Sequence, residues 1–110
     1  MSQKPSVGRV VHYTLRDGRS AGQNRPAIVV RAWDDEQTSY PPGTVNLQVF
    51  LDGSNDDGAE GIDGNASPVA LTTWVASVHE DDPTAMAERV AQGRGPGYQP
   101  GTWHWPPRVS

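Results

Sequence analysis

At residues 44–51 the chain reads TVNLQVFL, and this stretch gives the clearest indication of the fold class. Aliphatic side chains occupy every second position, namely Val45, Leu47, Val49 and Leu51, and alternate with Thr44, Asn46, Gln48 and Phe50. Successive side chains of an extended strand point to opposite faces, so the four aliphatic residues share one face. The alternation therefore predicts a β-strand that buries this face in a core.

Further strands are predicted on both sides of this one, over residues 7–15, 27–33 and 69–79, with a short edge strand over 102–105. The period of two places Val7, Val11, Tyr13 and Leu15 on one face of the first strand. It places Trp74, Ala76 and Val78 on one face of the fourth strand, and Leu71, Thr73 and Val75 on the other. The fold predicted is mainly β: a small, bent antiparallel sheet, or an SH3-like barrel if residues 102–105 supply a fifth strand.

One short helix is predicted over residues 83–92. Asp82 is a suitable N-cap, Pro83 suits the first helical position, and Gly93 suits the residue after the C-cap. Met86 and Val90 lie one turn apart and are expected to dock the helix on the sheet. The 110 residues then form a single domain, with a β core at 7–79, the helix, and a Gly/Pro-rich, Trp-containing tail at 93–110.

Composition restricts the setting of the protein. The chain has no cysteine, which excludes disulfides, thiolate catalysis and cysteine zinc sites and favours a reducing cytoplasm. The first residues lack the apolar stretch of a signal peptide, and no segment approaches the ~20 apolar residues of a membrane helix. A cytoplasmic protein without membrane contact is therefore expected.

Charge is distributed unevenly along the chain. Residues 1–33 hold six Lys and Arg against one Asp, whereas residues 34–110 hold three Arg against twelve acidic residues. A protein that binds duplex DNA is normally basic overall, so the net charge of −4 argues against that partner. The basic first third indicates a local site for an anion, unless its Arg side chains are simply solvated.

A ligand site is predicted from arginine and tryptophan together: Arg16, Arg19, Arg25, Arg31, Trp33, Trp103 and Trp105. A guanidinium group binds phosphate in a fork, and an indole offers a face on which a base stacks. The ligand expected is an anionic small molecule such as a nucleotide, with Arg25 and Arg31 as the main phosphate donors. The alternative is that the tryptophans form the core of a chain that is poor in aliphatic residues.

Signs of catalysis and of metal binding are weak, and we predict a non-enzymatic protein without cofactors. The chain has no Gly-x-Ser-x-Gly elbow, no Walker loop and no Gly-x-Gly-x-x-Gly fingerprint. The acidic loop 52–63 has the length of an EF-hand loop, but Asp57 replaces the required Gly and Asp63 the bidentate Glu. The histidines, His12, His79 and His104, follow no ligand spacing and are expected to be structural.

Three segments carry a resemblance to known proteins: Val7-Gly-Arg-Val-Val-His-Tyr, Arg25-Pro-Ala-Ile-Val-Val and Gly101-Thr-Trp-His-Trp-Pro. They resemble a group of small phage- and prophage-encoded proteins of unassigned function. The resemblance implies a viral setting, in which small proteins serve as virion components, as inhibitors of host factors, or as sponges for nucleotide immune signals.

The function predicted is accordingly a binding module that sequesters a nucleotide-type immune signal in the host cytoplasm. The alternative is a virion structural or adaptor protein, or an inhibitor of a host protein, that acts through protein–protein contact. A homo-oligomer is expected if Trp103 and Trp105 form an exposed edge, because such an edge is a liability in a monomer. Otherwise this edge strand should dock on its own sheet.

Overall fold

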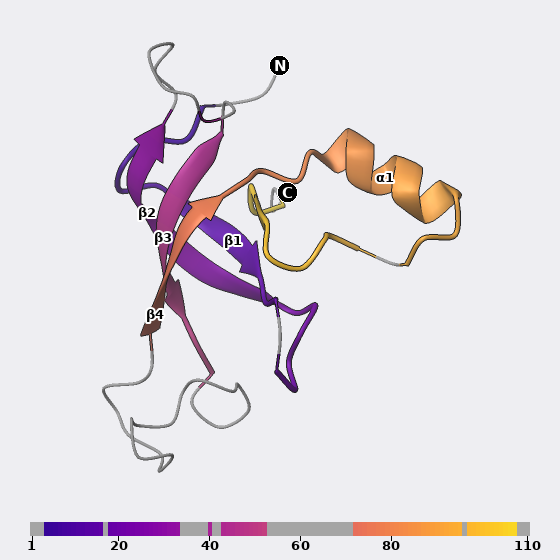
Figure 1. Ribbon diagram of the computed structural model, residues 1–110, viewed down its shortest axis with the longest axis horizontal. Coiled ribbons are helices and arrows are strands. Elements are labelled where there is room, and N and C mark those ends of the chain that lie inside the picture. Colours follow the sequence, from indigo (N-terminus) through magenta and orange to yellow (C-terminus); the bar gives the residue numbers. More distant parts are fainter. Residues whose placement is uncertain are drawn as a thin grey trace.

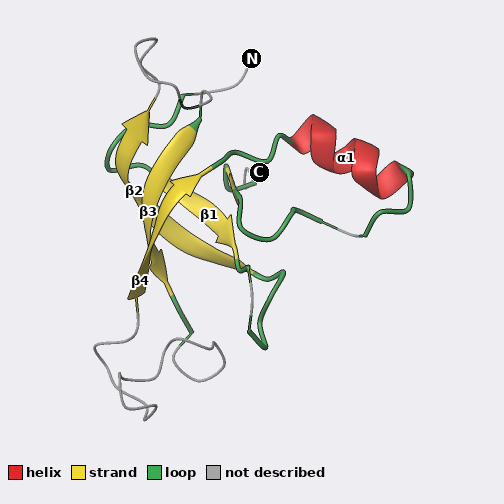
Figure 2. Ribbon diagram, in the orientation of Figure 1, coloured by secondary structure: helices red, strands yellow, loops and turns green. Residues whose placement is uncertain are grey.

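A computed structural model of the chain describes residues 4–16, 18–33, 40, 43–52, 72–95 and 97–107. Its elements are β1 (Val10–Thr14), β2 (Asn24–Trp33), β3 (Thr44–Phe50), β4 (Thr72–Val78), α1 (Pro83–Ala91) and β5 (Trp103–His104) (Figure 2). The prediction of a mainly β protein with one short helix is confirmed. Most of the acidic loop 52–63 lies outside the described residues.

The five strands form one antiparallel sheet in the order β4-β3-β2-β1-β5, with β2 at its centre (Figure 1). Strand β2 begins at Asn24, three residues before the predicted start, and includes Pro26 opposite His12. Residue pairs in an antiparallel ladder alternate between hydrogen-bonded and non-hydrogen-bonded pairs. Because Leu15 N donates to Gln23 O, the pair that contains Pro26 is a non-hydrogen-bonded one, and the nitrogen of Pro26 points away from β1. Pairing of β2 with β3 begins at Ala27, so the missing N–H of Pro26 removes no ladder bond.

Two β-bulges bend the sheet, and both lie opposite Asn46 of β3. In β2 the register shifts between Val29 and Arg31, and in β4 an extra residue lies between Val75 and Val78. The second bulge contains Ser77 in the left-handed region (φ 55°), and the Asn46 side-chain oxygen accepts a hydrogen bond from Ser77 N. Bulges increase local twist and bend a strand, which turns this sheet toward a barrel.

The core lies on one face of the bent sheet. The predicted aliphatic face of β3 is buried: Val45, Leu47 and Val49 are inaccessible, and Leu51 packs against them. Val78 also joins the core, together with Val75, although strict alternation puts it on the face of Trp74. The bulge at Ser77 reverses the alternation and explains the difference. Val7 is exposed, because β1 begins only at Val10.

Trp103 closes the sheet at one end. Strand β5 pairs with β1 through Trp103 opposite Tyr13. On its other side, Trp103 N donates to His79 O (3.1 Å) and Trp103 O accepts from Asp81 N (2.8 Å), so β5 also joins the chain just after β4. The indole is fully buried, and its Nε1 donates to Gly43 O at 2.7 Å. The tail thus docks on its own sheet, which is one of the two outcomes expected for an edge strand containing tryptophan.

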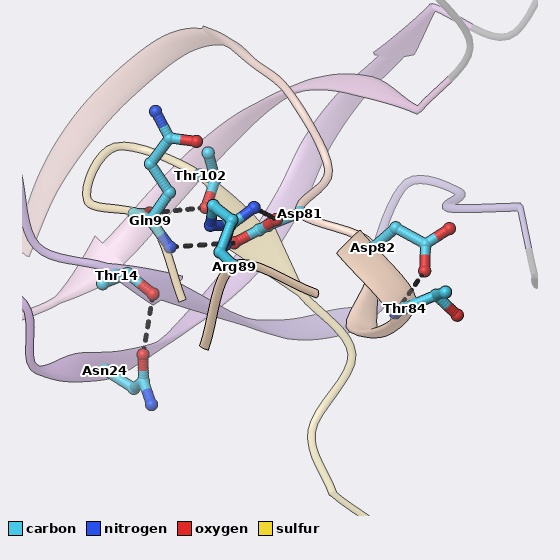
Figure 3. Close-up of polar contacts among 8 residues, drawn as sticks. All are labelled: Thr14, Asn24, Asp81, Asp82, Thr84, Arg89, Gln99 and Thr102. Atoms are coloured by element: carbon cyan, nitrogen blue, oxygen red, sulfur yellow. Dashed lines mark hydrogen bonds and ion pairs between the residues drawn. The ribbon is translucent and has the colours of Figure 1, made fainter. Parts of the chain in front are cut away.

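Helix α1 is confirmed with its caps, since Thr84 N donates to the Asp82 carboxylate and Gly93 adopts a positive φ of 75°. The helix stands beside the sheet and buries no residue, so Met86 and Val90 do not dock it as predicted (Figure 1). An ion pair anchors it instead (Figure 3). Both guanidinium ends of Arg89 bind the buried Asp81, which also accepts a bond from Gln99 N. In the described part of the chain, no helix has the length and apolar composition needed to span a membrane.

Candidate functional site

A polar pocket of about 320 Å³ lies where the loop between β1 and β2 meets the end of β3. Its lining residues are Arg19, Ser20, Gln23, Arg25 and Asp52. Arg19 and Arg25 belong to the predicted ligand site, and the structure brings them together. Ser20, Gln23 and Asp52 were missed, because Ser20 and Gln23 are uncharged loop residues and only the fold places Asp52, at the end of β3, against this loop.

Arg25 is held in place at the rim of the pocket. Its two terminal nitrogens donate to Asn24 O (3.0 Å) and to the side-chain oxygen of Gln23 (3.1 Å). The neighbouring Asn24 is fixed in turn, since its side-chain oxygen accepts a hydrogen bond from the buried Thr14 hydroxyl at 2.7 Å (Figure 3). A guanidinium with fixed direction loses less conformational entropy when it binds a phosphate.

The pocket combines charges of both signs. Arg19 and Arg25 supply forked N–H donors, whereas the Asp52 carboxylate supplies acceptors. Each of these three residues also makes contacts within the protein, so a ligand must replace or share existing interactions. This arrangement suits a molecule that carries both an anionic group and hydroxyl donors.

A second cluster lies at the other end of β2. The Arg31 guanidinium lies over the Trp33 ring at 4.8 Å from its centroid, and Trp33 packs against Tyr40 with ring centroids 5.0 Å apart. The prediction that Arg31 and Trp33 share a strand face holds, because both follow the bulge. Arg25 and Arg31 are six residues apart on β2, roughly 20 Å at the rise of a strand, so one mononucleotide does not reach both.

The remaining predicted residues lie elsewhere. Arg16 is exposed at the end of β1, with the stem of its side chain next to Gly101 of the tail. Trp103 is part of the core, and Trp105 packs against it edge to face with ring centroids 5.3 Å apart. Arg9, which was not predicted as a site residue, lies over the Trp105 ring at 5.2 Å. Both indoles therefore contribute to packing.

Two of the histidines meet across the β1–β5 pair. His12 lies opposite His104, with the ring centroids 5.6 Å apart and edge to face, and Tyr98 stacks flat on His104 at 3.5 Å. His104 is buried, and its Nδ1 has no hydrogen-bond partner in the described part of the chain. Burial, followed by the proximity of His12, lowers the pKa of His104 from 6.5 to about 4, although Asp81 opposes the shift.

The cluster of His12, Tyr98 and His104 is an aromatic packing unit. Among the described residues, no three His, Asp or Glu side chains are placed to hold a metal ion. The third histidine, His79, is exposed and hydrogen-bonds through Nδ1 to the Thr44 hydroxyl (3.1 Å).

Comparisons with protein-family models, with curated proteins and with solved structures give no match for this chain.

Proposed function

We propose that the protein is a non-enzymatic binding module that sequesters a nucleotide-type small molecule. The observation that carries the proposal is the pocket in which Arg19 and Arg25 face the same space as Asp52. In this proposal the two guanidinium groups bind the phosphate, and the carboxylate accepts hydrogen bonds from ribose hydroxyls. The ligand thus uses both kinds of charge that line the pocket.

The size of the pocket restricts the ligand. Small-molecule sites span roughly 300–1,000 Å³, and the volume of about 320 Å³ lies at the lower end of that range. A single nucleotide unit suits this space better than a polyphosphate. The side chains of Gln23 and Ser20 add neutral donors and acceptors that can orient the ligand.

The Asp52 carboxylate makes the proposed site selective. It repels any anion placed next to it, so inorganic phosphate alone gains less than a ligand that also brings hydroxyl donors. Sequestration needs no chemical step, and so it needs only affinity and sufficient protein. The resemblance to phage and prophage proteins supports the host cytoplasm as the proposed setting and a nucleotide immune signal as the proposed ligand.

Isothermal titration calorimetry against inorganic phosphate and against mono-, di- and cyclic nucleotides tests the proposal. At least one nucleotide should bind more tightly than phosphate. One charge-assisted hydrogen bond contributes roughly 1.5–3 kcal/mol, so Arg19→Ala or Arg25→Ala should weaken binding by about 10- to 100-fold. Arg31→Ala is the matched control, because its guanidinium lies at the other end of β2, and it should bind as the wild type does.

The Asp52→Asn variant distinguishes selective binding from simple charge attraction. Loss of the carboxylate should strengthen the binding of inorganic phosphate and weaken that of the nucleotide, because ribose then loses an acceptor. Absence of heat with every nucleotide would refute the proposal. Binding that persists in Arg19→Ala and Arg25→Ala but is lost in the control would place the ligand at Arg31 instead.

A further inference from the structure

The face of the sheet opposite the core exposes a group of large apolar side chains, and we call it the open face. Strand register aligns Val10, Ile28, Gln48 and Trp74 in one row across β1 to β4. The exposed fractions are 59% for Trp74, 52% for Val10, 44% for Val30 and 41% for Phe50. Contiguous exposed apolar side chains on a soluble domain mark sites where other molecules dock.

A positive charge is fixed on the same face. The β2 bulge lies between Val29 and Arg31, so both Val30 and Arg31 point away from the core. Stacking on Trp33 holds the Arg31 guanidinium, and this ring contact is its one interaction with the described residues. Because the N–H donors lie in the plane of the guanidinium, stacking leaves them available to an acceptor from outside.

The described strand residues of the open face carry no negative charge. None of the strands β1 to β4 contains an Asp or Glu, so all thirteen acidic residues of the chain lie outside these strands. The complement of such a face is apolar and carries a carboxylate that can reach Arg31. Trp, Tyr and Arg are also the residue types that dominate binding energy in protein interfaces.

We propose that the open face binds a protein partner through a peptide segment in which Asp or Glu stands next to large apolar residues. The apolar side chains cover Trp74, Phe50 and Val30, and the carboxylate accepts a forked pair of hydrogen bonds from Arg31. This site is independent of the nucleotide pocket, and it corresponds to the protein-contact function predicted as the alternative from the sequence.

Two other occupants fit less well. A second copy could pack its own open face against this one. Its strands bring a second Arg31 and no carboxylate, so the positive charge of Arg31 stays uncompensated. A single-stranded nucleic acid needs a groove with several cations, whereas the strands of the sheet hold only Arg25 and Arg31, at opposite ends of β2. The chain as a whole also has a net charge of −4, which disfavours a polyanion.

Selection from a library of random linear peptides displayed on phage tests the proposal, with the folded full-length protein as bait. Enriched peptides should pair Asp or Glu with Phe, Leu or Trp. Fluorescence anisotropy of a synthesised winner should show at least tenfold weaker binding to Arg31→Glu and to Trp74→Ala. Arg25→Ala, which changes the nucleotide pocket, should bind the peptide as the wild type does. All three substituted side chains lie outside the core, so the variants should fold. Circular dichroism is the measurement that checks this.

Four results would overturn the proposal. The first is a selection without enrichment, and the second is a winner whose affinity ignores both substitutions. The third is a dimer of the wild type, seen by analytical sedimentation, that dissociates in the Trp74→Ala variant. In that case a second copy of the chain covers the open face. The fourth is binding of a labelled 20-nucleotide oligo-dT that is weakened by the same two substitutions. Because the pocket and the open face use Arg25 and Arg31 separately, either proposal can fail without the other.

Discussion

The buried imidazole of His104 should make the protein sensitive to acid. Its ring stacks on Tyr98, meets His12 edge to face and is 1% exposed, and its Nδ1 has no hydrogen-bond partner among the described residues. Burial and the nearby His12 lower its pKa from 6.5 to about 4. The unfolded chain therefore takes up a proton as the pH falls below about 6.5, whereas the folded protein takes it up only near pH 4.

The sign and size of the effect follow from this difference. The contribution of His104 to stability is complete above pH 6.5 and is lost as the pH falls toward 4. Each pKa unit corresponds to about 1.4 kcal/mol, so the full loss is about 3 kcal/mol. Substitution His104→Phe keeps an aromatic ring for Tyr98 to stack on and removes the titration. It also removes the unpaired Nδ1, so the variant should be at least as stable as the wild type at pH 7.

Urea unfolding followed by tryptophan fluorescence, at pH values between 7.5 and 4, measures the effect. The free energy of unfolding should fall more steeply in the wild type than in His104→Phe, and the difference should grow as the pH approaches 4. The His79→Gln variant controls for the loss of a histidine outside the cluster of His12, Tyr98 and His104. Equal slopes for the wild type and His104→Phe would refute the reasoning.

Three further substitutions test the fold. Leu47→Pro should abolish the cooperative unfolding transition, because Leu47 lies in β3 between Val29 and Val75 and proline removes a ladder donor; a folded circular dichroism spectrum would contradict this. Trp103→Phe should lower the free energy of unfolding by about 1–3 kcal/mol, since Gly43 O loses its partner in a buried site, and an unchanged urea midpoint would speak against it. Arg89→Ala should speed hydrogen exchange in α1, because the ion pair with Asp81 holds the helix, whereas the exposed Arg94→Ala should not.

Local patterns in the sequence were sufficient to predict the strands, the helix and its caps. The alternation of Val45, Leu47 and Val49 requires one buried face, and Asp82, Pro83 and Gly93 act only on their neighbours in the chain. The stacking of Arg31 on Trp33 was also predictable in part, because residues two apart on a strand share a face. Such features depend on short spacings that a sequence displays directly.

The way in which these elements combine into surfaces depends on long-range contacts that local patterns do not reveal. The β4 bulge opposite Asn46 reversed the alternation at Val78, because an extra residue in one strand depends on how its neighbour pairs. The helix is anchored by the ion pair of Asp81 with Arg89 and not by its apolar face, since long polar side chains reach partners that periodicity does not reveal. Asp52 lies beside Arg19 and Arg25 because the pocket is lined by segments that are distant in sequence and meet only after the sheet has folded.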